Sequence, residues 1–499
     1  MEEMKILFLS PEAVPFAKSG GLADVAGSLP LALKRLGMDV RLIIPYYQSV
    51  KEGKFDNQLL IKNLEVPMGD EHLECDVREG TTEGGDLPVY FVEREDLYER
   101  HGLYGNEKGD YYDNLERFAF FAHSALKLAQ YLHFVPHIIH CHDWQTGLIP
   151  ALLKGPYHGI PAFSKTSTVF TIHNMGYQGI FPAGKLPLTG LPHADFFHMR
   201  GVEYWGNISL LKAGMVYADA VTTVSPTYAR EIQTPEYGMG MEGVLHGRRE
   251  SLSGILNGID YGRWDPGIDP VISAPYCPDR MTGKRKCKEF LMREMNIKAG
   301  LRRRPLLAMI SRLDAQKGLD LLVKILNDIL ALDVGLVVLG SGDEGIHMAI
   351  KEASENHPGK VGIHIGFNDP LAHQILAGAD IFLIPSRYEP CGLTQMYALK
   401  YAAVPVVRAT GGLNDTVTQY NKKTGKGNGF KFGPYKAGAF LQAIRQAVSL
   451  YGDSKMWRQI ISNGMSMDFS WESSAKKYEE IYASLLKKRN QQPPAQLAV

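Results

Sequence analysis

Short apolar runs rich in β-branched residues alternate with longer segments of helical spacing along most of this chain. Such alternation is typical of parallel β-sheets that are covered by helices on both faces, because their buried strands read as continuous apolar runs. With 499 residues, the chain is too long for one ordinary domain and suits two cores of about 200 to 250 residues each. The sequence therefore predicts an α/β fold with two Rossmann-like, doubly wound domains.

The predicted strands fall into two groups with a proline-rich segment between them. Strands are predicted in the first half at residues 6–9, 40–44, 89–92, 138–141, 169–172, 220–224 and 254–256, and in the second half at 306–310, 335–339, 362–365, 381–384 and 404–407. We therefore predict domains at residues 1–265 and 305–470, a linker at 266–304, a last helix at 471–487 and a disordered tail at 488–499.

Composition excludes several classes of protein. Lys plus Arg and Asp plus Glu both number 54, and no basic run has interleaved aromatic residues, so nucleic acid is not expected as a partner. Five cysteines without a CxxC pair are typical of a reduced, cytoplasmic chain. The sequence shows no signal or transit peptide and no apolar stretch long enough to span a membrane. We therefore expect a cytoplasmic protein of bacterial origin that does not enter a membrane.

The most informative motif is residues 386–395, which follow a predicted strand and precede a helical pattern. The turn formed by Cys391, Gly392, Leu393 and Thr394 offers backbone N–H groups at a helix N-terminus, which is a typical site for phosphate. The carboxylate of Glu389 would repel a bare phosphate but could accept hydrogen bonds from sugar hydroxyls. The combination indicates a site for a phosphorylated sugar, and an ordinary strand–helix turn is the alternative.

Two further segments place cations or glycines after predicted strands. Lys18, Gly20 and Gly21 follow the first strand, where glycines permit close approach of the backbone to a ligand. Arg312 and Lys317 follow a strand of the second half, and two cations suit a diphosphate. Surface salt bridges would explain each cation separately. Because open α/β sheets bind ligands at the carboxyl ends of their strands, we expect one active site in a cleft between two facing domains.

Eight segments together resemble one known family. They are KSGGLADV at 18–25, HDWQTGL at 142–148, FTIHNMGYQG at 170–179, VSPTYAREI at 224–232, GILNGID at 254–260, SRLDAQKGLD at 311–320, RYEPCGLTQMYALKY at 387–401 and TGGLNDTV at 410–417. In this order and spacing they are similar to bacterial glycogen synthases and plant starch synthases, which are retaining glucosyltransferases of family 5 with the two-domain B-type fold. The resemblance covers most of the chain and implies that the last helix crosses back to the first domain.

The resemblance implies an enzyme of glycogen biosynthesis that transfers glucose from ADP-glucose to the non-reducing end of an α-1,4-glucan, either glycogen or a maltooligosaccharide, with retention of configuration. The catalytic residues it implies are Glu389, His173, Arg312 and Lys317, and those that bind the donor are Lys18, Gly20, Gly21, Arg312, Lys317, Phe367, Cys391, Gly392, Leu393 and Thr394. On the acceptor side it implies Asp24, Tyr104, Asp143, Trp144, Asn174 and Asn257. We expect Phe367 to stack on adenine, Trp144 to stack on a pyranose, and the glycine pair at 411–412 to lend N–H groups to the donor.

Neither a metal nor another cofactor is expected. The sequence has no Asp-x-Asp, a pair with which metal-dependent nucleotide-sugar transferases hold their ion. His140, Cys141 and His142 look like metal ligands, but successive residues of a strand point to opposite faces and cannot easily converge on one ion. The GxGxxG at 340–345 would suit a dehydrogenase, but it does not lie in the first βαβ unit of the chain, and we interpret it as a turn.

Other functions compete with this interpretation. A starch synthase, or a glucan synthase that uses UDP-glucose, would differ only in acceptor or donor. A glycan phosphorylase shares the fold class, but phosphorylases are usually longer and bind pyridoxal phosphate through a lysine. A non-catalytic glycan-binding protein would be expected to lose Arg312, Lys317 and Glu389, all of which are present.

Overall fold

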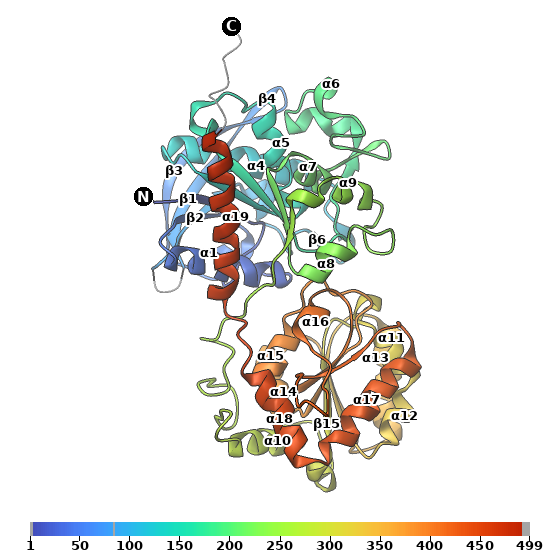
Figure 1. Cartoon of the computed structure of the whole chain (residues 1–499). Coiled ribbons are helices and arrows are strands. Elements are labelled where there is room, and N and C mark those ends of the chain that lie inside the picture. The colour runs from blue at the N-terminus through green and yellow to red at the C-terminus, as the bar shows by residue number, and fades with distance from the viewer. Residues whose placement is uncertain (1–2, 83–84, 492–499) are drawn as a thin grey trace. The chain divides into compact units, whose positions relative to one another are not determined.

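The computed structural model describes residues 3–82 and 85–491, and the chain divides into two compact units. Unit 1 consists of Met1–Val224, Ala229–Gly258 and Trp471–Val499, and unit 2 consists of Ser225–Tyr228 and Ile259–Ser470 (Figure 1). Each unit is an α/β structure with its own central sheet. The last helix of the chain therefore belongs to the first unit, whereas four residues near position 226 belong to the second.

A nine-stranded sheet forms the centre of unit 1, with the order β14-β13-β9-β8-β1-β2-β5-β4-β3 among the described residues. Its strands are β1 (Lys5–Leu9), β2 (Asp39–Pro45), β3 (Asn57–Met68), β4 (Glu71–Thr81), β5 (Pro88–Glu93), β8 (Ile138–His142), β9 (Ser167–Ile172), β13 (Ala220–Thr223) and β14 (Leu252–Gly254). The strands from β14 to β5 pair in parallel, and β3 and β4 extend the sheet as an antiparallel hairpin. The carboxyl ends of β1, β8 and β9 thus meet at one edge.

Helices cover the sheet of unit 1. Its helices are α1 (Gly21–Arg35), α2 (Gln48–Glu52), α3 (Glu95–Tyr98), α4 (Asn114–Tyr131), α5 (Leu148–Lys154), α6 (His193–Phe196), α7 (Leu210–Tyr217), α9 (Glu242–Gly247) and α19 (Trp471–Gln491). The short helix α8 (Pro226–Glu231) begins in the segment assigned to unit 2 and ends in unit 1. α1 and α19 pack side by side, as Figure 1 shows, and the Arg35 guanidinium lies 2.9 Å from the Glu472 carboxylate. The C-terminal helix is therefore an integral part of unit 1.

Unit 2 is built on a six-stranded, wholly parallel sheet with the order β17-β16-β15-β18-β19-β20 among the described residues. Its strands are β15 (Leu306–Ile310), β16 (Gly335–Gly340), β17 (Val361–Ile365), β18 (Ile381–Ile384), β19 (Val404–Arg408) and β20 (Phe430–Phe432). This order is that of a Rossmann fold, in which the direction of strand addition reverses between the first and fourth strands, here β15 and β18. Ligands bind at such a reversal.

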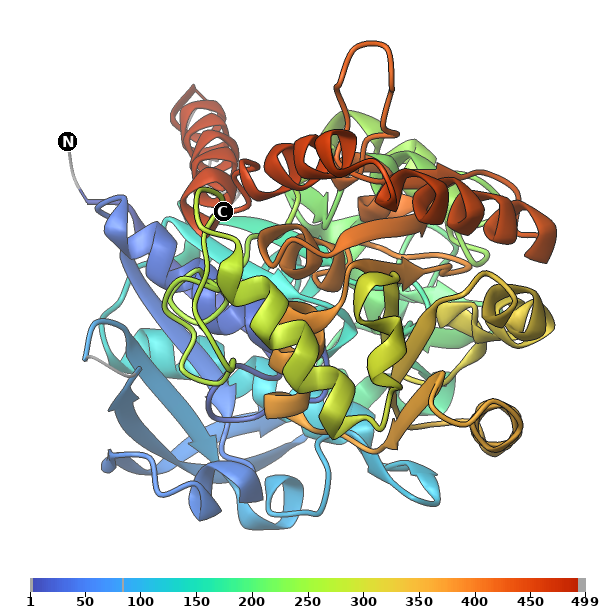
Figure 2. The same cartoon turned by 90° about the horizontal axis from the view of Figure 1, so that it is seen from below.

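Alternate residues of each strand in unit 2 face two different layers of helices. Its helices are α10 (Thr282–Glu294), α11 (Leu319–Lys324), α12 (Leu326–Leu330), α13 (Glu344–Asn356), α14 (Asp369–Gly378), α15 (Thr394–Lys400), α16 (Gly411–Thr416), α17 (Ala437–Tyr451) and α18 (Ser454–Met465). Leu307 and Met309 of β15 join a buried cluster with α11, α12, α13 and α17. α10 packs on α14, and Figure 2 shows it, in yellow-green, on the outside of the unit.

Several predicted elements differ from those observed. The strand predicted at 254–256 lies at Leu252–Gly254. The helical segment after β15 is divided into α11 and α12 at Ile325, whose N–H bonds to the carbonyl of Leu322 in a tighter turn. The β3–β4 hairpin and β20 were not predicted. The hairpin lies at the edge of its sheet, its outer residues are polar, and register shifts near Ile61 break the alternation that a strand prediction needs.

The predicted linker at 266–304 is wrong, because this segment is part of unit 2. Two of its lysines are buried: Lys288 lies 2.6 Å from the Asp380 carboxylate, and Lys284 donates to the carbonyl oxygen of Tyr401 at 2.7 Å. The first domain ends at Gly258 rather than at 265, and the second begins at Ile259 rather than at 305. α19 extends to Gln491, so the first four residues of the predicted disordered tail are helical, and the rest of that tail lies outside the described residues. None of the described helices combines the length and the apolar character that crossing a bilayer requires.

Candidate active site

Three loops of unit 2 leave the carboxyl ends of β15, β18 and β19 and meet at one edge of the sheet. They are residues 311–318, 385–393 and 409–412. The carbonyl oxygen of Gln316 in the first loop accepts a hydrogen bond from the backbone N–H of Arg387 in the second at 2.7 Å. The guanidinium of Arg408, at the end of β19, donates to the carbonyl oxygen of Arg387. The loops are therefore held together at the reversal of strand order, where a ligand is expected.

Lys317 and Glu389 form a close ion pair at this edge. The ammonium nitrogen of Lys317 lies 2.7 and 3.0 Å from the two carboxylate oxygens of Glu389, whose side chain is only 9% exposed. The hydroxyl of Ser386 donates a further hydrogen bond to Glu389 at 2.9 Å. An ammonium group has three N–H donors, of which the carboxylate engages two. One donor of Lys317 thus remains for a ligand beside a fixed carboxylate.

The turn that follows Glu389 presents backbone N–H groups. Among the described residues, no hydrogen-bond acceptor is found for the backbone N–H of Gly392, Leu393 or Thr394. Gly392 has a left-handed conformation with φ of 69°, and a Cβ there would collide with the side chain of Gln395. Cys391 is buried, and its carbonyl oxygen accepts from the Gln395 amide at 3.0 Å. Cys391 therefore shapes the turn, and the next three residues offer donors.

Gly411 and Gly412 pack against this turn. A Cβ on Gly411 would collide with the carbonyl oxygen of Glu389, and a Cβ on Gly412 would collide with that of Cys391. The N–H of Gly412 donates to the carbonyl oxygen of Glu389 at 3.1 Å. The prediction that this pair lends N–H groups to the donor is therefore wrong for Gly412, whose N–H is already used within the protein. Positions 411 and 412 are glycines because their loop lies in close contact with the backbone of Glu389 and Cys391.

Arg312 and Phe367 follow β15 and β17 at the same edge, and both side chains are largely exposed. The guanidinium of Arg312 lies 3.3 Å from the carboxylate of Asp314, and 56% of the Arg312 side chain is exposed. Phe367 is 85% exposed. Phosphate binding by Arg312 and base stacking by Phe367 stay predictions.

The segment from Ser225 to Thr227 completes this edge of unit 2, although sequence reasoning gave it no role. The hydroxyl of Ser225 donates to the carbonyl oxygen of Pro390 at 2.6 Å. Thr227 donates its backbone N–H and its hydroxyl to the carboxylate of Asp415, at 2.7 and 2.6 Å. The motif VSPTYAREI, which carried part of the family resemblance, was the available signal.

In unit 1, a buried carboxylate that sequence reasoning missed holds the glycine loop before α1. Ser19 donates its backbone N–H to Glu12 at 2.7 Å and its hydroxyl at 2.5 Å. Burial raises the pKa of Glu12, and the hydrogen bonds from Ser19 oppose that rise. Lys18, next in the loop, forms an exposed ion pair with Asp24 at 2.8 Å. Glu12 lies seven residues before Ser19, and no sequence pattern links the two.

Gly20 is not required by the structure of the loop. Its φ of −155° is an extended conformation that any residue can adopt, and the nearest protein atom to a Cβ there would be 3.8 Å away. Gly21 begins α1. The protein therefore has room for a side chain at position 20, and close approach of a ligand is the remaining reason for a glycine.

Asp143 follows β8 in a strained backbone conformation. Its φ of 56° and ψ of −177° lie in a region that residues other than glycine rarely occupy, at a cost of about 1–3 kcal/mol. Its carboxylate accepts a hydrogen bond from the backbone N–H of His173 at 2.7 Å. Burial raises the pKa of Asp143 to about 7, although backbone hydrogen bonds from His173 and Asn174 oppose the rise. Strain and a shifted pKa in one residue are typical of functional sites.

Three histidines lie together at the ends of β8 and β9. His142 Nδ1 and His173 Nε2 are 2.9 Å apart, and His140 bonds to the hydroxyls of Thr171 and of Tyr482 in α19, each at 2.7 Å. Burial lowers the pKa of His140 and of His173 to about 3, and it lowers that of His142 well below its usual value. His173 is therefore neutral near pH 7 and can exchange hydrogen bonds with a ligand without adding charge.

Two other residues predicted for the acceptor side, Trp144 and Asn174, make contacts within the protein. Trp144 is only 8% exposed and packs against Phe118, Phe181 and the backbone of Gly179, so the structure contradicts the prediction that its face stacks on a sugar. The Asn174 side chain accepts from the N–H of Gly176 at 2.9 Å.

Several buried polar atoms of unit 1 have no hydrogen-bond partner among the described residues, and three of them belong to predicted site residues or to a neighbour of one: Tyr104 Oη, His142 Nε2 and Asn257 Oδ1. Burial also raises the pKa of Tyr104 well above its usual value, so its hydroxyl stays protonated. Buried polar groups are nearly always satisfied, and exceptions call for an explanation. Tyr104 and Asn257 were both predicted to bind the acceptor, and a sugar hydroxyl would supply what they lack.

Comparison with known proteins identifies the family. Residues 5–247 match the family described as starch synthase catalytic domain, and residues 293–466 match glycosyl transferases group 1. The chain is 46% identical to a glycogen synthase from Syntrophotalea carbinolica over 479 residues, which cover 96% of this chain and 98% of the relative. This chain belongs to the glycogen synthase and starch synthase family.

Other members of the glycogen synthase and starch synthase family agree. A glycogen synthase from Desulforamulus reducens is 44% identical over 97% of this chain and 99% of its own. The structure also resembles the catalytic domain of starch synthase IV from Arabidopsis thaliana bound to ADP and acarbose, with a TM-score of 0.89 and 32% identity over 97% of this chain and 100% of that one. The predicted family, the two-domain B-type α/β fold and a glucosyltransferase as the class of enzyme are thus confirmed.

Proposed function

We propose that this glucosyltransferase moves glucose from ADP-glucose to the 4-hydroxyl at the non-reducing end of an α-1,4-glucan, with retention of configuration. Two kinds of relative support the proposal. Proteins 44–46% identical over nearly the whole chain are glycogen synthases, and the similar starch synthase IV structure holds ADP and the oligosaccharide acarbose.

The observation that carries the proposal is the Lys317–Glu389 pair at the reversal of strand order in unit 2. A nucleotide-sugar needs a cation for its diphosphate and an acceptor for its sugar hydroxyls within a few ångströms. Lys317 and Glu389 supply both groups 2.7 Å apart, and the pairing with Lys317 offsets the repulsion between the carboxylate and a phosphate. The free N–H groups of Gly392, Leu393 and Thr394 lie on the following turn.

Negative charge develops on the diphosphate as ADP leaves, and fixed positive groups stabilise it most at that point. We assign this role to Arg312, Lys317 and the N–H groups after Glu389. Both carboxylate oxygens of Glu389 are engaged, by Lys317 and Ser386, so it is better placed to orient the glucose than to attack it. We therefore favour attack by the acceptor from the face that ADP leaves. In residues 3–82 and 85–491, no group of three or more His, Cys, Asp or Glu side chains is arranged so that it could hold a metal ion, and a metal-free reaction stays a prediction.

The glucan is proposed to contact unit 1 through Asp143, His173, Tyr104 and Asn257. Asp143 and the neutral His173 are coupled by the 2.7 Å hydrogen bond from the His173 backbone, so a sugar that bonds to one is positioned against the other. The unpaired hydroxyl of Tyr104 and the unpaired amide oxygen of Asn257 can bond to sugar hydroxyls. Together these groups suit a polyhydroxyl ligand.

The test is an incubation of the purified protein with ADP-glucose or UDP-glucose and with glycogen, with and without excess chelator. We expect release of ADP that depends on glycogen and on the protein, new α-1,4 linkages by proton NMR, and the same rate with chelator. If UDP is released at the same rate as ADP, the enzyme accepts a broader class of donors than ADP-glucose alone. Nucleotide release without chain extension would refute the proposed transfer.

A further inference from the structure

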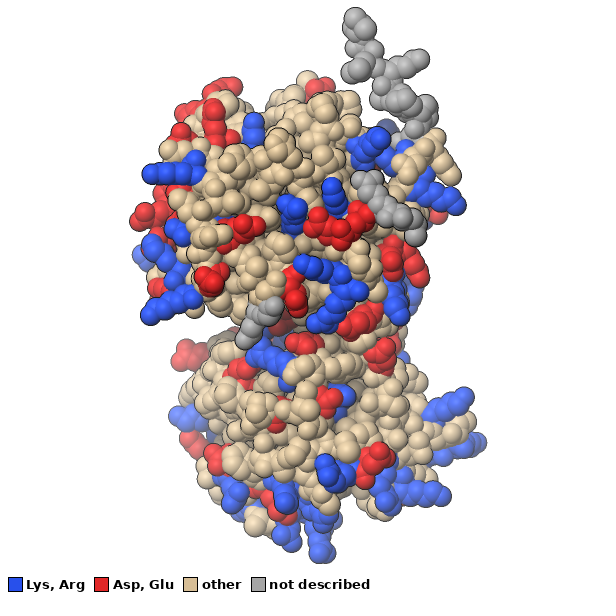
Figure 3. Space-filling model, turned by 90° about the vertical axis from the view of Figure 1, so that its left-hand side faces the viewer, with Lys and Arg blue, Asp and Glu red and all other residues tan. Residues whose placement is uncertain are grey.

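The most asymmetric distribution of charge lies away from the candidate active site. Residues 280–304 of unit 2 carry ten Lys or Arg and only two Glu, whereas the chain as a whole has no net charge. They form α10 and the turn η5 (Ala299–Arg303). Figure 3 shows blue Lys and Arg side chains along the lower rim of the face that carries α10, with few red ones between them.

Part of this charge has a structural role. The buried Lys284 and Lys288 bond to carbonyl oxygens and to Asp380, and the Arg304 guanidinium lies 2.7 Å from the Asp333 carboxylate. These contacts anchor α10 and the end of η5 to the sheet. They account for three of the ten cations and leave the others to be explained.

A cavity of about 490 Å³ lies between the second half of α10 and η5. We call it the basic pocket; the apolar residues that line it include Phe290, Met292 and Ile297, and its cations are Lys286, Arg293 and Arg302. Glu289 is the one acidic residue among those that line it in the described part of the chain. The pocket thus combines an apolar wall with a surplus of two positive charges, in a volume typical of small-molecule sites.

The cations of the basic pocket are weakly engaged within the protein. The Arg302 guanidinium lies 3.7 Å from Glu289, beyond hydrogen-bonding distance, and an exposed pair of this kind contributes little. The Arg293 guanidinium lies 5.9 Å from the centre of the Phe290 ring. No ion pair or hydrogen bond to Lys286 is found among the described residues. The three cations are therefore available to a ligand at the side of an aromatic ring.

The basic pocket is separate from the donor groups of unit 2. η5 leads into the amino end of β15. Asp333 and Asp380, which bind the same segment, lie two residues before β16 and directly before β18. Arg312 and Glu389 lie at the carboxyl ends of these parallel strands, on the opposite edge of the sheet. A ligand in the basic pocket would therefore not be the sugar donor in its own site.

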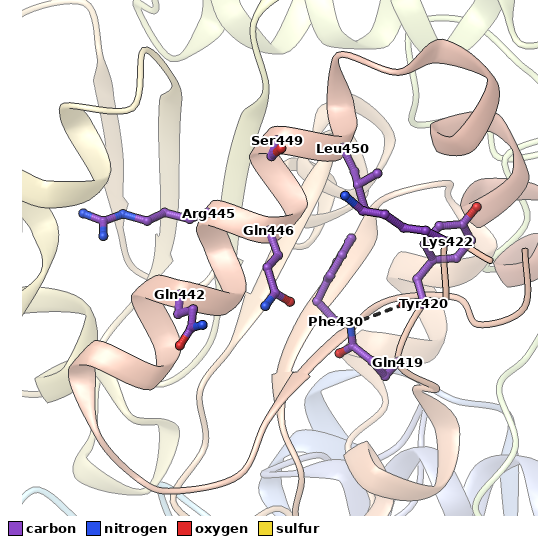
Figure 4. A pocket seen from close by; sticks show the side chains of 9 residues that line it. All are labelled: Gln419, Tyr420, Lys422, Phe430, Gln442, Arg445, Gln446, Ser449 and Leu450. Atoms are coloured by element: carbon purple, nitrogen blue, oxygen red, sulfur yellow. Dashed lines mark hydrogen bonds between the residues drawn. The ribbon is translucent and has the colours of Figure 1, made fainter. Parts of the chain in front are cut away.

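A second hollow of unit 2 is a weaker candidate. It measures about 310 Å³ and lies between α17 and the segment before β20 (Figure 4). Its cations are Lys422 and Arg445, but Figure 4 shows the Arg445 side chain pointing away from the other residues that line it. The cations of this hollow therefore do not converge on one ligand.

We propose that the basic pocket binds a small phosphate ester. A dianionic phosphate matches the surplus of two positive charges, and arginine binds phosphate through two parallel N–H bonds. Phe290 and Ile297 would cover the flat or apolar part of the ester. Inorganic phosphate alone would leave this apolar wall exposed to water, so the ester should bind more tightly than the free ion.

The test is isothermal titration calorimetry of the full chain with phenyl phosphate and with inorganic phosphate, at about 0.15 M salt, where the attraction of distant charges is screened. We expect saturable binding of phenyl phosphate at least tenfold tighter than that of inorganic phosphate. Arg293→Glu and Arg302→Glu should each weaken phenyl phosphate binding more than tenfold. Phe290→Ala should weaken binding of phenyl phosphate but not of inorganic phosphate.

Two variants are the matched controls. Arg285→Glu makes the same change of charge on the same helix, outside the pocket, and should alter the affinity less than threefold. Arg312→Ala alters the proposed donor site and should leave the affinity unchanged. If Arg285→Glu weakens phenyl phosphate binding as much as Arg293→Glu and Arg302→Glu do, the ligand is attracted by the general positive charge of the helix. If Arg312→Ala weakens the binding, the ligand lies at the donor site. Either result overturns the proposal, and so does a lack of saturable binding. If a Glu variant fails to fold by circular dichroism, Arg293→Ala and Arg302→Ala replace it.

Discussion

Replacing Asp143 by asparagine tests whether one buried carboxyl group makes unit 1 sensitive to pH. Burial raises the pKa of Asp143 from 3.8 to about 7. Between these values the folded chain keeps a proton that the unfolded chain has released. The stabilising contribution is therefore complete below pH 3.8 and is lost as the pH rises through about 7. A shift of about three units corresponds to about 4 kcal/mol, at roughly 1.4 kcal/mol per unit.

The asparagine cannot ionise, but its carbonyl oxygen can still accept the hydrogen bond that the His173 N–H makes at 2.7 Å. We expect the free energy of unfolding of Asp143→Asn, relative to the parent, to rise by about 3 kcal/mol between pH 4.5 and pH 8, because about 1 kcal/mol of the total is already lost at pH 4.5. Any cost of burying the amide N–H groups is the same at every pH. For a unit of this size the change corresponds to a relative gain of about 6–12 °C in melting temperature.

Differential scanning calorimetry of the full chain measures this gain at several values of pH. Glu12 and the buried histidines also titrate with folding, but both proteins contain them, so their contributions largely cancel in the difference. Asp110→Asn removes an exposed carboxyl group from the same unit and is the matched control. If the difference in melting temperature between Asp143→Asn and the parent stays constant from pH 4.5 to pH 8, the reasoning from burial is refuted.

Three further predictions concern the catalysed reaction and the binding of its donor. Arg312→Ala or Lys317→Ala should lower the turnover number by about 10² to 10³, because each removes a charge that acts as ADP leaves, and near-normal turnover in both would remove the donor-site assignment. Glu389→Ala should be almost inactive and Glu389→Gln strongly impaired, with ADP affinity by calorimetry largely kept; a parallel collapse of ADP affinity would place Glu389 in the nucleotide pocket instead. Gly20→Ala should fold with unchanged melting temperature but raise the KM for ADP-glucose about tenfold or more, because the methyl group occupies space next to the ligand, and an unchanged KM would mean that no ligand approaches Gly20.

The central strands of both sheets could be predicted from the sequence because they are buried on both faces. β15 and β18 lie at the predicted residues, and each is a run of apolar residues without interruption. The β3–β4 hairpin could not be predicted, because half of its residues face water and its register shifts. Parallel strands that are buried on both faces can therefore be recognised in the sequence, whereas the partly exposed strands at the edge of the sheet cannot.

Lys284 and Lys288 show why the linker was misplaced. A segment with four prolines and many basic residues reads as exposed, and lysine is rarely buried without a partner. Their partners include the Asp380 carboxylate and the carbonyl oxygens of Leu376 and Tyr401, which lie about 90 or more residues away in the sequence and are brought close only by the folded chain. A charge pattern alone cannot show that such a lysine is satisfied internally.

The candidate site of unit 2 was predictable in kind but not in detail. Cations, glycines and a carboxylate at strand ends were enough to place a ligand there, because parallel strands bring their carboxyl ends to one edge. The sequence did not show that Lys317 and Glu389, 72 residues apart, bond to each other. Nor did it show that Gly411 serves close packing against Glu389, because a glycine that makes room for backbone and one that makes room for a ligand look the same.

In unit 1 several costs to stability fall on residues that are proposed to bind the acceptor. The backbone strain at Asp143 costs about 1–3 kcal/mol, and each buried polar atom without a partner costs a similar amount. Among the unpaired buried atoms of unit 1 are those on Tyr104 and Asn257, and one on His142 beside His173. A sugar hydroxyl can both donate and accept, so one ligand can satisfy a phenol and an amide oxygen together. Such a site is destabilising when it is empty, and its polar groups gain hydrogen bonds when a sugar fills it. Because these groups are already fixed in place, binding requires little further ordering, and the affinity for the sugar is higher.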